Sequence, residues 1–165
     1  MKKLEKNLDI RDEFFGVLLG IARCDKNVIL LTADTGALGV TKFKEEFPDR
    51  YFNIGIAEQN MVNIAIGMTL AGKKVFCYCI ASFLRRCYEQ IYLVGNMNLP
   101  IVFIGMGPER DYGTDGYTHW FDDDKKVMGA IPNMHIEDAD LPLNARNACY
   151  VAYTIKEPVY VRLRK

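Results

Sequence analysis

The residue types that carry chemistry in this chain follow short apolar segments. Glu58 comes shortly after Gly55 and begins a stretch whose apolar residues have helical spacing. Its neighbours Ile56, Ala57 and Met61 are apolar, and such surroundings favour a carboxyl group that can share a proton. The alternative is an ordinary first-turn glutamate that the helix dipole stabilises. Spacing alone favours this second interpretation.

His119, Asp115 and Asp34 are further candidates, each in a segment that follows an apolar run. A lone histidine in a loop is more often simply exposed to solvent. Asp115 precedes Gly116, a pair that also forms ordinary turns. Aspartate in a loop such as that of Asp34 is commonly a helix cap. Position alone therefore leaves the chemical role of these residues open.

The cysteines form no recognisable redox or metal site. Cys77 and Cys79 are separated by one residue, a spacing unlike that of a redox pair or a zinc knuckle. His119 and His135 lie far along the chain from them, so no compact set of metal ligands emerges and we expect none. We interpret all five cysteines as core thiols; they are Cys24, Cys77, Cys79, Cys87 and Cys149.

Length and composition limit the class of protein. The chain of 165 residues fits one domain, and 50% apolar residues are enough for a buried core. The 21 basic and 21 acidic residues cancel, which argues against nucleic-acid binding because that needs a basic surplus. The sequence shows neither a secretory signal nor an apolar run long enough to span a bilayer. We therefore expect a soluble cytoplasmic domain that binds neither nucleic acid nor membrane.

Strand-like and helix-like segments alternate along the sequence. Several strand-like segments are apolar at consecutive positions, as strands covered on both faces are. The expected strands are Val28–Ala33, Phe52–Ile54, Lys74–Ile80, Pro100–Met106, Met134–Ile136 and Val159–Leu163. Helical spacing follows a predicted cap at Asp9, precedes Gly72 and Gly95, and covers 141–154. This alternation predicts a three-layer α/β/α domain with a mostly parallel sheet.

Ligands of such a fold bind beyond the carboxyl ends of the strands. The segments that follow the expected strands there are 34–39, 55–60, 81–83 and 107–121, and they hold nearly every candidate for chemistry. None of them has the pattern of a P-loop or of a G-x-G-x-x-G fingerprint. A nucleotide site is therefore not indicated.

Four segments resemble one known family. Residues 47–60, F-P-D-R-Y-F-N-I-G-I-A-E-Q-N, closely resemble the F-P-x-R…G-I-A-E-Q stretch of the pyrimidine-binding domain of the transketolase family. Residues 83–90 are similar to the F-x-x-R-x-Y-x-Q run of 1-deoxyxylulose-5-phosphate synthases. Residues 115–119 resemble D-G-x-T-H, and 158–163 resemble the closing P-x-x-x-R-L strand. The resemblance runs from about Arg11 to the last residue and implies the thiamine diphosphate-binding fold of the pyrimidine-binding type.

The family resemblance implies thiamine diphosphate chemistry, in which the cofactor's carbanion attacks a carbonyl and carries a two-carbon fragment to an acceptor. It implies that Glu58 hydrogen-bonds the pyrimidine ring nitrogen and promotes formation of that carbanion. It also implies that Phe83 stacks on the aminopyrimidine, and that Asp34 and Ile56 lie beside the cofactor. From position alone, Phe83 has the alternative role of an ordinary core residue.

The same resemblance implies a substrate site. In it His119 binds the substrate carbonyl or hydroxyls and transfers protons, and Asp115 holds a substrate hydroxyl. Three arginines match or lie near family positions close to a substrate phosphate, and guanidinium groups bind phosphate oxygens well. They are Arg86, Arg11 and Arg164. A phosphorylated or otherwise anionic small-molecule substrate is therefore expected.

Some positions depart from the family pattern. Where the deoxyxylulose-phosphate synthases have a serine two places before the stacking phenylalanine, this chain has Ala81. After the histidine, transketolases usually continue with glutamine, and here Trp120 follows. We expect the Trp120 ring to fill the channel mouth, unlike a standard sugar-phosphate acceptor site. The aspartates at 122–124 have the alternative interpretation of a solvated helix start.

The sequence has no G-D-G…N segment, which in this family binds the diphosphate through Mg²⁺, and no transketolase C-terminal domain. We therefore expect residues 1–165 to be one pyrimidine-binding domain of a split enzyme. A partner subunit would supply the diphosphate-binding domain and the Mg²⁺ ligands, in an α₂β₂ assembly.

Three functional hypotheses remain. The first is a transketolase-like transferase that moves a ketol or acyl unit to an aldehyde or ketone, such as a sugar or sugar phosphate. The second is a subunit of a thiamine diphosphate-dependent decarboxylase or 2-oxoacid dehydrogenase, and the third is a noncatalytic module derived from such an enzyme. The D-G-x-T-H motif together with Arg86 favours the first. The joint presence of Glu58, Phe83, Asp115 and His119 argues against the third.

Overall fold

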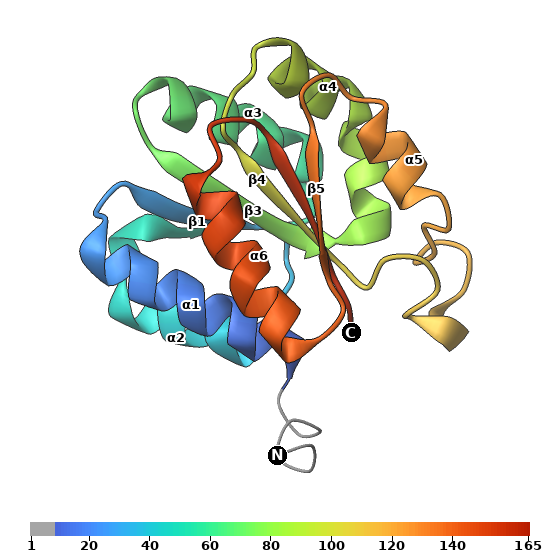
Figure 1. The fold of residues 1–165 in the computed structure, drawn as a ribbon, viewed down its shortest axis with the longest axis horizontal. Helices are drawn as coiled ribbons and strands as arrows, with labels where there is room; N and C mark the ends of the chain where they lie inside the picture. Colours follow the sequence, from blue (N-terminus) through green and yellow to red (C-terminus); the bar gives the residue numbers. More distant parts are fainter. Residues whose placement is uncertain (1–8) are drawn as a thin grey trace.

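A computed structural model describes residues 9–165, and in that range six strands form one sheet in which every neighbouring pair is parallel. Their spatial order is β2-β1-β3-β4-β6-β5 (Figure 1). The strands are β1 (Val28–Thr32), β2 (Tyr51–Asn53), β3 (Lys74–Ile80), β4 (Val102–Met106), β5 (His135–Ala139) and β6 (Val159–Leu163). The predicted α/β class and parallel sheet are confirmed.

Helices cover both faces of the sheet, so the domain has three layers (Figure 1). Helices α1 (Ile10–Cys24), α2 (Leu38–Glu46) and α6 (Pro142–Thr154) lie on one face. Helices α3 (Glu58–Leu70), α4 (Tyr88–Asn96) and α5 (Asp124–Gly129) lie on the other. Short 3₁₀ turns are η2 (Pro48–Arg50), η3 (Ala81–Cys87) and η4 (Gly113–Asp115).

Strand β3 shows why the central strands are apolar at consecutive positions. Phe76 and Tyr78 are buried on the face covered by α1 and α6, while Cys77 and Cys79 are buried on the face covered by α3 and α4. Successive side chains of a strand point to opposite faces, so a strand covered on both faces must be apolar at every position. The sheet therefore separates two cores.

Most predicted elements are present, and the differences are local. The Asp9 side chain accepts a hydrogen bond from the Arg11 backbone N–H at 2.9 Å, which confirms the predicted cap of α1.

Helix α2 was not predicted. Its N-cap is Ala37, with no capping side-chain bond in the described residues, so the usual sequence signal of a helix start is missing. Burial of Val40 and Phe43 holds it against the sheet.

The interpretation of all cysteines as core thiols is wrong for Cys24, which is exposed at the end of α1. The other four are buried, and burial raises the pKa of each of their thiols: Cys77, Cys79, Cys87 and Cys149.

Within residues 9–165, no three His, Cys, Asp or Glu side chains are grouped to hold a metal ion. Over the same range no helix is both long and apolar enough to cross a membrane.

A buried arginine at the end of β6 ties several elements together. Arg162, 4% exposed, donates to Asp124 of α5 through Nε at 2.6 Å and Nη2 at 3.1 Å. It also pairs with Glu109 at 2.7 Å and with Asp138 of β5. Tyr160 donates to Asp124 at 3.0 Å. Asp124 is 1% exposed, so the interpretation of the aspartates at 122–124 as a solvated helix start is wrong for this member.

We expect Asp124→Asn to destabilise the protein by about 1–3 kcal/mol, because it removes the one fully buried carboxylate of the three that pair with Arg162 and weakens its hydrogen bonds. The matched control is Asp122→Asn, since Asp122 is half exposed and pairs with the exposed Arg110. The free energies of unfolding are measured by urea titration. Equal effects of the two substitutions would show that Arg162 does not depend on Asp124.

Candidate active site

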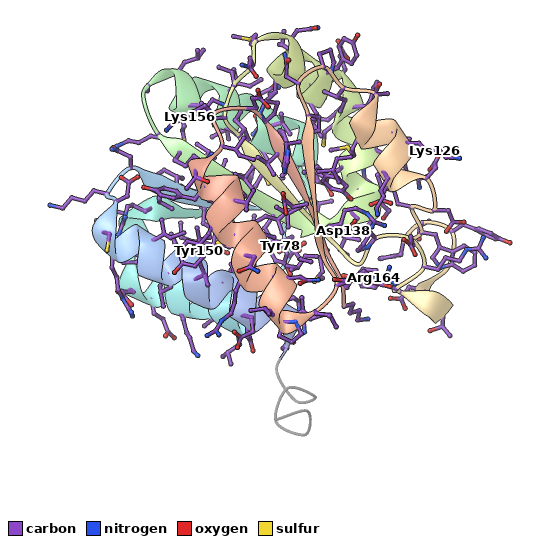
Figure 2. The ribbon with its side chains drawn as sticks, viewed as in Figure 1. Tyr78, Lys126, Asp138, Tyr150, Lys156 and Arg164 are labelled. Atoms are coloured by element: carbon purple, nitrogen blue, oxygen red, sulfur yellow. The ribbon has the colours of Figure 1, made fainter. Side chains whose placement is uncertain are left out.

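The loops that hold the candidate residues lie at one edge of the sheet, because all its strands are parallel and their carboxyl ends point the same way. Figure 2 shows Arg164 just beyond β6 at this edge and Lys156 before β6 at the opposite edge. The predicted meeting of the strand-end segments is therefore present.

Glu58 is a buried acid at the start of a helix. It is the first residue of α3 and only 2% exposed. The chain turns into the helix through Gly55, whose φ of +76° favours glycine. Ile56, 78% exposed, lines a depression of about 390 Å³ together with Glu58 and Arg86. The Glu58 carboxylate is therefore almost inaccessible to solvent, although it lines an open pocket.

Arg86 lies directly against Glu58 and links it to Phe83. The Arg86 Nη1 is 3.2 Å from Glu58 Oε2 and 3.4 Å from Oε1. The Arg86 guanidinium carbon lies 4.9 Å from the centroid of the Phe83 ring. Both residues belong to η3, which follows β3, whereas Glu58 begins α3. Strand β3 and helix α3 therefore position these three side chains.

His119 completes the cluster from the long loop after β4. Its ring centroid is 5.2 Å from that of Phe83, and its Nδ1 is 3.0 Å from the Thr118 hydroxyl. Ser82 donates to the Thr118 carbonyl at 3.0 Å, which fastens the loop to η3. The predicted residues Glu58, Phe83, Arg86 and His119 are therefore brought together.

Tyr112 is a member of this cluster that sequence reasoning missed. Its ring lies 5.4 Å from that of His119, and burial raises the pKa of its hydroxyl to about 12. The ring packs against Gly107, where a Cβ would overlap it, and Gly107 has φ of +63°. A glycine directly after the apolar β4 run was the available signal for a closely packed ring.

The other two predicted arginines bind acids of this chain. Arg11 pairs with Asp9 at 2.5 Å, and its Nη1 is 3.7 Å from the Met106 sulfur at the end of β4. Arg164 pairs with Glu109 at 3.1 Å and with Asp111 at 2.5 Å. Both guanidinium groups lie near the carboxyl edge of the sheet, but each is engaged with carboxylates.

Asp34 and Asp115 are exposed, and the Asp115 backbone N–H donates to the Tyr112 carbonyl at 3.0 Å. The Asp34 backbone N–H donates to Asn53 at 3.0 Å, and the same Asn53 oxygen accepts from Gly55 at 3.0 Å. Asp34 is therefore fixed beside the turn that leads to Glu58. Asp115 ends the 3₁₀ turn η4 on the loop that carries His119.

Trp120 packs within its own loop. Its Nε1 donates to the Gly113 carbonyl at 3.0 Å, its ring meets Tyr117 edge-on at 4.8 Å, and Arg110 lies 4.7 Å from its ring centroid. These contacts stiffen the segment that presents His119. A role for Trp120 in filling a channel mouth stays a prediction.

A buried glutamate at a helix start, a half-buried phenylalanine and a loop histidine gather at the carboxyl edge of this three-layer parallel domain. The comparison with known proteins gives the family directly. The family model described as "Transketolase, pyrimidine binding domain" matches residues 6–165. The chain belongs to this family.

Individual relatives agree with that assignment. A 1-deoxy-D-xylulose-5-phosphate synthase of Glaesserella parasuis is 36% identical over 147 residues, which are 88% of this chain and 24% of that protein. A putative transketolase C-terminal section of Methanocaldococcus jannaschii is 32% identical over 157 residues, which are 93% of this chain and 50% of that protein. The chain thus spans about a quarter to a half of the length of these relatives.

Solved structures share the fold. A split gene transketolase, in an inactive β4 tetramer, has a TM-score of 0.83 at 27% identity, covering 95% of this chain and 51% of that one. The transketolase of Campylobacter jejuni has a TM-score of 0.87 at 21% identity, covering 97% of this chain and 26% of that one.

We expect Gly107→Ala to loosen the loop that presents His119, because the added Cβ displaces the Tyr112 ring and the backbone has positive φ. The control is Gly72→Ala, between α3 and β3, which has positive φ but nothing within 4 Å of an added Cβ. Trp120 is the single tryptophan of the chain, so its fluorescence reports the loop. Gly107→Ala should shift this emission. It should also lower the free energy of unfolding by about 1–3 kcal/mol more than the control does. Equal effects of the two substitutions would contradict the packing argument.

Proposed function

We propose that this chain is the pyrimidine-binding subunit of a split, transketolase-like enzyme that transfers a two-carbon ketol or acyl unit to an aldehyde or ketone acceptor. The observation that carries this proposal is the series of contacts that joins the buried Glu58, through Arg86, to the half-buried Phe83 and His119. A noncatalytic module would need none of these residues in contact.

The described residues fit the aminopyrimidine of thiamine diphosphate. A planar, nitrogen-bearing group already stacks on Phe83 and donates to Glu58 in this structure, namely the Arg86 guanidinium. Glu58 would share a proton with the pyrimidine ring nitrogen, Phe83 would support the ring face, and Ile56 and Asp34 would border it. When bound, thiamine diphosphate supplies the carbanion equivalent that carries the two-carbon unit.

The substrate would be held by the residues of the β4 loop. His119 is half-buried and reaches toward Phe83, so it would donate a hydrogen bond to the substrate oxygen and move a proton there. Asp115, exposed on the same loop, would accept from a substrate hydroxyl. To bind an anionic substrate group, Arg11 would first have to leave Asp9, and Arg164 would first have to leave Glu109 and Asp111.

A partner chain with the diphosphate-binding domain is supported by two comparisons, the split gene transketolase and the transketolase C-terminal section. That partner would carry the G-D-G…N segment and the Mg²⁺ ligands, in an α₂β₂ assembly with shared sites. The transketolase and deoxyxylulose-phosphate synthase relatives are the reason to place the reaction among the aldehyde- and ketone-group transferases.

We expect Glu58→Gln to lower the turnover of the reconstituted complex by about 100-fold or more, because the amide cannot hold the proton that activation requires. Turnover is measured as consumption of ketose phosphates or pyruvate by the chain co-purified with a G-D-G…N chain, thiamine diphosphate and Mg²⁺. The control is Glu157→Gln, an exposed glutamate before β6 at the opposite edge.

Full activity of the Glu58→Gln complex would contradict the role of Glu58. A wild-type complex that binds thiamine diphosphate but consumes neither class of donor would contradict the proposed transferase activity. Release of CO₂ from a 2-oxoacid without transfer to an acceptor would point to a decarboxylase instead.

A further inference from the structure

The contacts of Arg86 are unusual for a residue expected to bind a substrate anion. Its guanidinium lies 4.9 Å from the Phe83 ring centroid and donates to both carboxylate oxygens of Glu58, at 3.2 and 3.4 Å. The side chain is 51% exposed, whereas Glu58 is 2% exposed. The guanidinium therefore lies between the Glu58 carboxylate and solvent.

These contacts are of the same two kinds that an aminopyrimidine ring would make. A guanidinium is planar, stacks on aromatic faces and presents N–H donors in its plane. An aminopyrimidine is also planar and would stack on the same phenylalanine while hydrogen-bonding the same glutamate, if the proposed function holds. The Arg86 guanidinium already makes both of these contacts, so the two groups would compete for Phe83 and Glu58.

We propose that Arg86 is an internal occupant of the pyrimidine position, which the incoming ring must displace before it can bind Glu58 and Phe83. The displaced side chain swings toward solvent, where half of it already lies. Glu58 then exchanges the guanidinium donors for a ring nitrogen with which it shares a proton, so it is never left buried and unpaired, which would be costly.

The neighbouring Arg85 shows that this position is particular to Arg86. The Arg85 guanidinium carbon lies 5.2 Å from the Phe121 ring centroid, and its Nε donates to the Ser82 carbonyl at 3.4 Å. Arg85 therefore has the same charge and the same turn η3 but different contacts. It is a matched control.

Self-occupation lowers the apparent affinity for the ring by the fraction of molecules in which the position is free. If the arginine-bound form outnumbers the free form about tenfold, removing Arg86 tightens ring binding about tenfold. This expectation is opposite to that for an arginine that only helps to hold ligands, whose removal leaves ring binding unchanged or weaker.

The test uses the full chain and 4-amino-2,5-dimethylpyrimidine, a ring that lacks the diphosphate and so does not depend on a partner chain. Binding is followed by NMR through the aromatic signals of Phe83 and His119. We expect Arg86→Ala to bind the ring about tenfold tighter than wild type and Arg85→Ala to bind like wild type. Glu58→Gln should weaken binding in either background.

Arg86→Lys is the second variant, because it keeps a positive charge near Glu58 if the alanine variant unfolds. An ammonium group lacks the planar stacking surface, so this variant should also bind the ring more tightly than wild type. Ring binding to Arg86→Ala or to a folded Arg86→Lys that is equal to or weaker than in wild type would overturn the displacement proposal while leaving the pyrimidine site intact. Absence of ring binding in every variant would overturn both this inference and the proposed function.

Discussion

The buried charge of Arg162 is the constraint on which the geometry of the site depends. Burial opposes its charge, yet hydrogen bonds to Asp124, Glu109 and Asp138 prevail and hold the pKa of its guanidinium above its ordinary value. A buried cation needs all its partners, so the start of the β4 loop, the first turn of α5 and the edge strand β5 must lie where the carboxylates meet it. The loop carrying His119 is thereby fixed at both of its ends.

From that fixed loop, a continuous series of side-chain contacts crosses the carboxyl edge of the sheet. Tyr112 meets His119, His119 meets Phe83, Phe83 meets Arg86, and Arg86 meets Glu58. The groups come from three separate connections between strands and helices. A parallel sheet brings such connections to one edge, and the Ser82–Thr118 hydrogen bond joins two of them directly.

Most of the fold was predictable because each central strand is apolar at consecutive positions and each helix has a periodic apolar face. Glu58, Phe83 and His119 were predictable because they stand in recognisable motifs. The pairing of Arg86 with Glu58 and the burial of Asp124 were not, since they depend on residues far apart in the chain. Helix α2 lacks a capping side chain, so packing of its apolar face on the sheet, not a local signal, specifies it.

The ion pair between Glu58 and Arg86 also bears on how the domain reaches its folded state. A carboxylate withdrawn from water is tolerated only with a counter-charge, and this one comes from the same chain, 28 residues away. The acid can therefore be buried as the sheet and α3 pack, with no ligand present. Correct folding then needs no second molecule to supply a counter-charge for Glu58.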